Sequence, residues 1–137
     1  MPITPQVKEQ LIARALKIRT RAYAPYSKYN VGASLLTDDG EIVDGVNVEN
    51  AVYSVGICAE RNAVFQAIVH GHRSFRAIAV ATDNGGSPCG SCRQVLAEFG
   101  RDIEIYTVDS DGKVILETTV KDLLPEAFGP EYLPKKG

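Results

Sequence analysis

Apolar residues recur with two periods along this chain, one typical of helices and one typical of strands. The first helical set follows Thr4-Pro5, which fits an N-cap followed by the first helical residue. Its apolar positions are Val7, Leu11, Ala15 and Ile18. This pattern predicts a helix that ends before a loop at residues 24–28, whose residue types favour turns.

Five later runs are continuously apolar or alternate as β-strands do. They cover residues 31–37, 41–48, 75–82, 103–108 and 114–118. Asp38-Asp39-Gly40 joins the first two runs, and the turn Asp109-Ser110-Asp111-Gly112 joins the last two. Both linkers are hairpin signals, so each of these two pairs is expected to be antiparallel.

Three further helices complete the predicted order α-β-β-α-β-α-β-β-α. They run from about Cys58 to His70 with Gly71 as the cap, from Gly90 to Phe99, and from Val120 to Leu124. Strands separated by a helix are expected to pair in parallel through right-handed crossovers. We therefore predict an α/β fold with three α/β/α layers, in which helices cover both faces of a mixed five-stranded sheet.

Composition narrows the class of protein and its partners. The 137 residues, 45% apolar and 23% charged, suit one compact domain over residues 1–137. The net charge is −2 and no basic stripe could follow a phosphate backbone, so no nucleic-acid partner is expected. Apolar runs are too short to cross a bilayer, and charges interrupt the N-terminal segment. We expect a cytoplasmic protein without a membrane partner.

The three cysteines fall at the starts of two predicted helices. Cys58 opens one helix, and Cys89 and Cys92 open the next in a Cys-x-x-Cys pattern. An odd cysteine count in a cytosolic chain argues against a disulfide framework and favours a metal or catalytic role. Helix N-termini lower the pKa of a thiol and favour the thiolate that binds metals. The alternative is a redox pair at Cys89 and Cys92, with Cys58 as a buried thiol.

A three-cysteine set leaves one position of a tetrahedral metal open. His70 and His72 are the only histidines, and His70 lies about 18 Å along the helix from Cys58. Structural zinc sites use four protein ligands, whereas catalytic sites keep a position for water. The pattern thus favours water activation over a non-catalytic zinc-binding module, which would require a closed site.

Two residues that follow Cys58 suit the same chemistry. Glu60 at the helix start is placed to move protons beside the metal, although an acidic residue there also favours the helix dipole. Three thiolates and a hydroxide would give a zinc cluster a net charge of −2. Arg61 is expected to offset part of that charge; the alternative is an ordinary surface residue.

Four stretches of the chain resemble the cytidine deaminase family, in its small homotetrameric form with three cysteines. They are NVENA at 47–51, CAER at 58–61, PCGSCRQ at 88–94 and LLPEAFG at 123–129. The resemblance implies one Zn²⁺ per subunit, held by Cys58, Cys89 and Cys92, with active sites shared between subunits. It also implies hydrolysis of cytidine and 2′-deoxycytidine to uridine and 2′-deoxyuridine, with release of ammonia, as in pyrimidine salvage. Zinc-activated water would attack C4 of cytosine while Glu60 carries protons to N3 and the leaving group.

The resemblance further implies the substrate contacts. Asn47 and Glu49 would hold the ribose, and a carboxylate there would repel a phosphate, which favours nucleosides over nucleotides. The remaining positions expected around the pyrimidine are Ala59, Tyr29, Tyr53 and Phe128, with some aromatic side chains donated by neighbouring subunits. Tyr29 departs from the family, where Phe is expected.

Two related activities are alternatives. One is deamination of another aminopyrimidine nucleoside, such as a cytosine-containing antibiotic nucleoside, but those relatives lack the Glu49-Asn50 pair. The other is deamination of a polynucleotide, which would require a basic, aromatic groove and commonly a His in place of Cys58. The tight turn after Val108 also leaves no room for a parallel crossover there.

Overall fold

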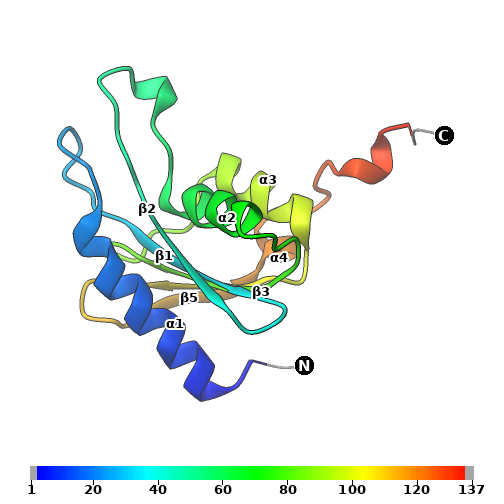
Figure 1. Ribbon diagram of the computed structural model, residues 1–137, viewed down its shortest axis with the longest axis horizontal. Coiled ribbons are helices and arrows are strands. Elements are labelled where there is room, and N and C mark those ends of the chain that lie inside the picture. The colour runs from blue at the N-terminus through cyan, green and yellow to red at the C-terminus, as the bar shows by residue number, and fades with distance from the viewer. Residues whose placement is uncertain (1–2, 135–137) are drawn as a thin grey trace.

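A computed structural model describes residues 3–134, so the ends of the expected 1–137 domain lie outside the described residues. The elements are α1 (Pro5–Ile18), β1 (Gly32–Thr37), β2 (Ile42–Val46), α2 (Ala59–Val69), β3 (Phe75–Ala81), α3 (Gly90–Phe99), β4 (Glu104–Val108), β5 (Val114–Thr119) and α4 (Val120–Leu123) (Figure 1). This order is the predicted one. Sequence analysis missed three short 3-10 turns, at Arg19–Arg21, Tyr53–Val55 and Pro130–Tyr132.

The five strands form one mixed sheet, as predicted, in the order β2-β1-β3-β4-β5. β3 and β4 are parallel, and the other neighbours are antiparallel. The expected parallel pairing of β2 with β3 is wrong, because β1 lies between them and pairs with both. All six residues of β1 are buried, whereas most of β2 is only half-buried. A strand apolar on both faces belongs in the middle of a sheet, and the less apolar strand is left at its edge.

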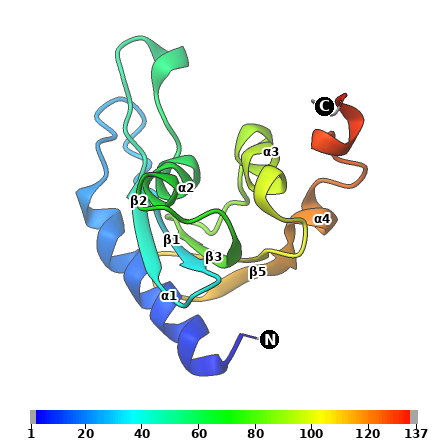
Figure 2. The ribbon, with the colours of Figure 1, turned by 45° about the vertical axis from the view of Figure 1, so that its right-hand side comes forward.

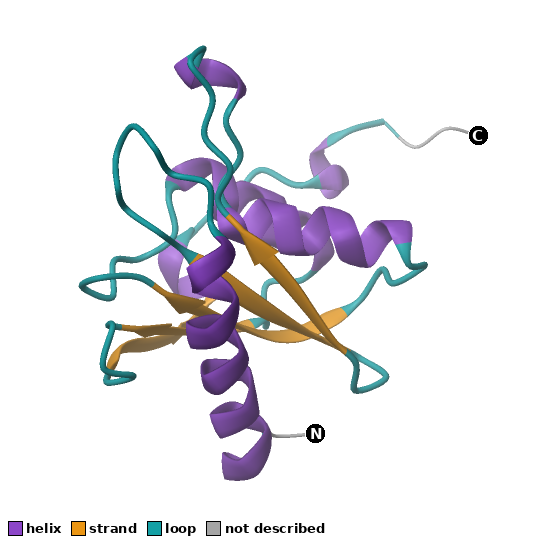
Figure 3. Ribbon diagram, turned by 60° about the vertical axis from the view of Figure 1, so that its left-hand side comes forward, coloured by secondary structure: helices purple, strands orange, loops and turns teal. Residues whose placement is uncertain are grey.

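Helices cover both faces of the sheet. α1 crosses one face alone, and α2 and α3 lie on the other (Figure 2, Figure 3). Leu11 and Ala15 of α1 pack on one set of strand residues, while Ala63 and Val64 of α2 pack on the opposite set with Leu96 of α3. β1, β2, β3 and β4 each contribute apolar side chains to both cores, whereas β5 contributes Val114 to the α1 side alone.

Two helices approach the sheet more closely than a side chain would allow. A Cβ on Gly32 would lie 2.2 Å from the Ala15 carbonyl oxygen of α1. A Cβ on Gly45 would lie 2.4 Å from the Ala63 nitrogen of α2. Because α2 begins directly after Cys58, the close contact between α2 and β2 helps to fix the position of Cys58. None of the helices in the described part of the chain has the length and hydropathy that crossing a bilayer requires.

Candidate active site

Two neighbouring helix N-termini bring the three cysteines together. Cys58 is the N-cap of α2, Cys89 is the N-cap of α3, and Cys92 lies buried in the first turn of α3. The Sγ atoms of Cys58 and Cys89 are 3.8 Å apart, and those of Cys89 and Cys92 are 3.4 Å apart. Sulfurs bound to a tetrahedral zinc at about 2.3 Å would lie about 3.8 Å from one another. The spacing of the sulfurs thus fits one metal ion.

No fourth Cys, His, Asp or Glu joins this group within residues 3–134. His70 caps the far end of α2. His72 instead faces the hairpin between β1 and β2, where its Nε2 is 2.6 Å from Glu41 and its Nδ1 is 3.5 Å from Asp39. The candidate metal-binding group within the described residues is therefore a set of three sulfurs, and their role as zinc ligands stays a prediction.

The electrostatics of the site favour a thiolate at Cys58. A hydrogen bond from the Cys92 thiol and a second from Arg61 lower the pKa of Cys58 to about 5. The same hydrogen bond, together with burial, raises the pKa of Cys92 well above its ordinary value. The Cys58 thiolate thus forms readily, whereas a bound cation would be needed to ionise the buried Cys92 thiol.

Arg61, the predicted charge-balancing residue, contacts the sulfur group. Its Nη2 donates to the Cys58 sulfur at 3.4 Å. Its Nε is buried without a hydrogen-bond partner among the described residues. A guanidinium this close to a thiolate offsets negative charge on the sulfur group.

Glu60 lies beside the sulfurs and is almost completely buried. Its exposed fraction is 6%, in the first turn of α2. Burial, reinforced by the negative charge of Cys58, raises the pKa of Glu60 to about 7. A carboxyl group with this pKa exchanges protons readily near neutral pH.

A cavity of about 620 Å³ opens above Glu60 and Cys58. The sequence-predicted residues that line it are Tyr29, Asn47, Glu49, Tyr53, Ala59, Glu60, Arg61, Cys58 and Cys89. Asn47 is buried beneath it, where its Nδ2 donates to the Tyr29 carbonyl and its Oδ1 accepts from the Val31 nitrogen. Phe128 does not line this cavity; the residue is 58% exposed, and its ring stacks on Tyr132 in the C-terminal segment.

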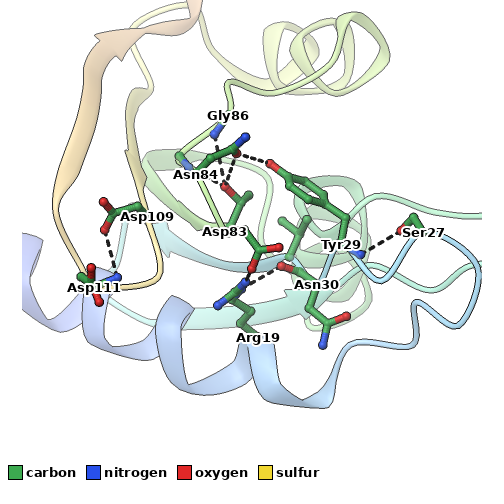
Figure 4. Close-up of polar contacts among 12 residues, drawn as sticks. Arg19, Ser27, Tyr29, Asn30, Asp83, Asn84, Gly86, Asp109 and Asp111 are labelled. Carbon is green, nitrogen blue, oxygen red and sulfur yellow. Dashed lines mark hydrogen bonds and ion pairs between the residues drawn. The ribbon is translucent and has the colours of Figure 1, made fainter.

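The hydroxyl that distinguishes Tyr29 from Phe has a defined partner. It donates to Asn84 Oδ1 at 2.8 Å, and the Thr82 hydroxyl donates to the same oxygen at 3.4 Å (Figure 4). The Thr82 oxygen in turn accepts from the nitrogens of Gly85 and Gly86. Tyr29 thus holds the loop that leads to Cys89. Sequence analysis missed Asn84, because only the fold places it beside Tyr29.

Comparison with known proteins agrees with this geometry. The family model described as "Cytidine and deoxycytidylate deaminase zinc-binding region" matches residues 5–108. The chain belongs to this family. A cytidine deaminase from Sporosarcina psychrophila is 52% identical over 128 residues, which are 91% of this chain and 93% of that protein. The crystal structure of cytidine deaminase from Burkholderia pseudomallei has a TM-score of 0.85 and 44% identity, and the match covers 92% of this chain and 100% of that one.

A relative with the alternative activity is less similar to this cytidine deaminase family member. Blasticidin-S deaminase from Bacillus cereus is 29% identical over 109 residues, which are 72% of this chain and 76% of that protein. The family resemblance drawn from the cysteine motifs is therefore confirmed, and the similarity to cytidine deaminases is the stronger one.

Proposed function

We propose that this enzyme hydrolyses cytidine and 2′-deoxycytidine to uridine and 2′-deoxyuridine with release of ammonia, using one zinc ion per chain. The observation that carries the proposal is a buried carboxyl group, Glu60, beside three converging sulfurs. Glu60, Cys58 and Cys89 line a cavity of about 620 Å³. The stronger similarity to cytidine deaminases favours this substrate over an antibiotic nucleoside.

The donor set suits zinc. Cys58, Cys89 and Cys92 would hold the ion, and thiolates select zinc over hard cations such as magnesium. When bound, zinc lowers the pKa of a water molecule at its open position and so supplies a nucleophile at neutral pH. Arg61 and the two helix N-termini stabilise the thiolates that this requires.

Glu60 carries the protons of the reaction. It accepts a proton from the attacking water and delivers it to N3 of the pyrimidine ring as C4 becomes tetrahedral. The second proton comes from the hydroxyl added at C4 and passes through the same carboxyl group to the exocyclic amine. The C4–N bond then breaks, ammonia leaves, and the C4 carbonyl of uridine forms. Burial raises the pKa of Glu60 to about 7 in the zinc-free site, which suits a side chain that acts first as base and then as acid.

Other residues of the cavity position the nucleoside. We assign Asn47 and Glu49 to the ribose, and Ala59, Tyr29 and Tyr53 to the pyrimidine side. Phe128 would act in the cavity of a neighbouring subunit, because its exposed ring lies outside the cavity of its own chain. The segment that carries Tyr53–Val55 projects from the body of the fold, which suits the same exchange (Figure 1). Both features support active sites shared between subunits, and the homotetramer itself is carried over from the family resemblance.

The proposal includes a setting in pyrimidine salvage, since the reaction returns a free nucleoside to the uridine pool. The cytoplasmic location expected from the sequence remains a prediction.

Incubation of the purified, zinc-loaded protein with cytidine tests the proposal through release of ammonia and formation of uridine. Glu60→Gln should lower kcat by at least about 100-fold with zinc content unchanged, because general acid–base catalysis contributes about that much or more. Glu98→Gln is the matched control, since Glu98 is an exposed carboxylate on the adjacent helix α3. A wild-type protein that releases no ammonia, or a fully active Glu60→Gln variant, would contradict the proposal.

A further inference from the structure

The carboxylate of Glu49 is held by a loop that precedes it by more than twenty residues. Its Oε1 accepts from the backbone nitrogens of Tyr26 and Ser27, each at 3.1 Å. Its Oε2 accepts from the hydroxyl of Ser27. Three donors from residues 26–27 therefore converge on the side chain that we assign to the ribose.

The Ser27 hydroxyl both accepts and donates a hydrogen bond in this arrangement. Its oxygen accepts from the Tyr29 nitrogen at 3.0 Å (Figure 4), and its single hydrogen is donated to Glu49. The backbone reaches this geometry through Lys28, which adopts the left-handed conformation at a φ of 61° and donates its N–H to the Ala24 carbonyl. Ser27 thus links the ribose side of the cavity to the backbone of Tyr29 on the pyrimidine side.

The number of acceptor positions left on Glu49 is small. An ionised carboxylate offers about four positions, two on each oxygen. Both positions on Oε1 and one on Oε2 are already used, so a single position remains for a ligand. The same hydrogen bonds, led by that from Ser27, lower the pKa of Glu49, so the group is ionised at neutral pH and only accepts.

We propose that Ser27 is a positioning residue that restricts Glu49 to one sugar hydroxyl, and that this restriction allows ribo- and 2′-deoxyribonucleosides to react comparably. The inference rests on the proposed function and deepens it. A carboxylate oxygen with two open positions can accept from both hydroxyls of a ribose, which would favour cytidine. With one position, Glu49 accepts only the 3′-hydroxyl that the two sugars share.

Ser27→Ala tests this with three substrates: cytidine, 2′-deoxycytidine and 2′,3′-dideoxycytidine. We expect KM for 2′-deoxycytidine to rise about tenfold, because the freed carboxylate is no longer aimed at the 3′-hydroxyl. The loss with cytidine should be at least about threefold smaller, since the second open position accepts its 2′-hydroxyl. Dideoxycytidine has neither hydroxyl, so its kcat/KM should stay within about twofold of wild type. Ser110→Ala, in an exposed turn away from the cavity, is the matched control.

A second pair of variants isolates the hydroxyl from the shape of the side chain. Ser27→Thr keeps the donor and should retain the wild-type ratio of the three substrates. Ser27→Val has the shape of the Thr variant without its hydroxyl and should behave as Ser27→Ala does. Equal losses for all three substrates, or an unchanged ratio of cytidine to deoxycytidine in both Ser27→Ala and Ser27→Val, would overturn the role of Ser27. A wild-type protein that deaminates none of these nucleosides would instead refute the proposed function.

Discussion

At the scale of single residues, burial and close polar partners set the chemistry of this site. Glu60 is kept from solvent beside the sulfurs, and its pKa rises for that reason. Glu49, at the open side of the same cavity, is surrounded by donors and its pKa falls. Two carboxylates eleven positions apart in the sequence thus differ in protonation because the fold surrounds them differently.

The raised pKa of Glu60 predicts a pH-dependent stability in the zinc-free protein. The unfolded chain loses this proton near the ordinary pKa of 4.5, whereas the folded protein keeps it until about pH 7. The free energy of unfolding therefore falls as pH rises from about 4.5 to 7, by on the order of 3 kcal/mol in all. Urea unfolding at pH 5 and pH 8 should show Glu60→Gln more stable relative to wild type at pH 8. If the difference between the two proteins is the same at both pH values, Glu60 is already ionised in the fold.

The Tyr29 hydroxyl should contribute measurably to stability. Tyr29→Phe removes its hydrogen bond to Asn84 and should lower the free energy of unfolding by about 1 kcal/mol. Combined with Asn84→Ala, it should show a coupling energy of similar size in a double-mutant cycle. Tyr23→Phe, at an exposed ring, serves as the control. Additive effects of the two substitutions would mean that the hydroxyl and the amide do not interact.

At the scale of elements, the position of α2 on the sheet determines where Cys58 and Glu60 lie. α2 can approach β2 closely only because residue 45 has no side chain. The sequence predicts both elements, yet it carries no local sign of this contact, since Ala59 and Ala63 follow Gly45 by 14 and 18 residues. The start of the helix was thus predictable from caps and spacing, and its distance from the sheet was not.

Gly45→Ala should therefore disturb both stability and the metal site. The added methyl would lie 2.4 Å from the Ala63 nitrogen and 2.5 Å from the Ala59 oxygen, so α2 must shift as a unit. We expect a loss of about 1–3 kcal/mol in the free energy of unfolding, with weaker zinc retention against a chelator. Gly90→Ala is the stability control, because a methyl there meets no atom within 4 Å. Equal stability of the two variants would show that α2 tolerates the displacement.

At the scale of the whole molecule, the three sulfurs bring together the N-termini of α2 and α3, two helices that the chain otherwise joins through β3. Cys58 precedes Cys89 by 31 residues, with α2 and β3 between them. A metal bound by both helix N-termini would hold α2 and α3 together in the folded state and not in the unfolded chain. Zinc binding should therefore stabilise the whole fold.

Removal of zinc tests this directly. A chelator should lower the Tm of the wild-type protein, since a ligand present at about 1,000 times its Kd adds about 4 kcal/mol of stability. Cys92→Ser should start from a lower Tm and respond little to the chelator, because one buried ligand is lost. Thermal unfolding with metal analysis of each sample provides the measurement. A wild-type Tm that the chelator leaves unchanged would contradict a metal shared by the two helices.

The sequence by itself determined the helices and strands and their order, the cysteine set and the family, because caps, periodicity and motif spacing are local properties of the chain. The tertiary structure alone decided that β1 lies between β2 and β3, because strand order depends on which strand can be buried on both faces. It also decided that Ser27 holds Glu49, that Asn84 holds Tyr29, and that Phe128 lies outside the cavity of its own chain. Those contacts join residues far apart in the sequence, and their side chains acquire their partners only when the sheet and helices pack.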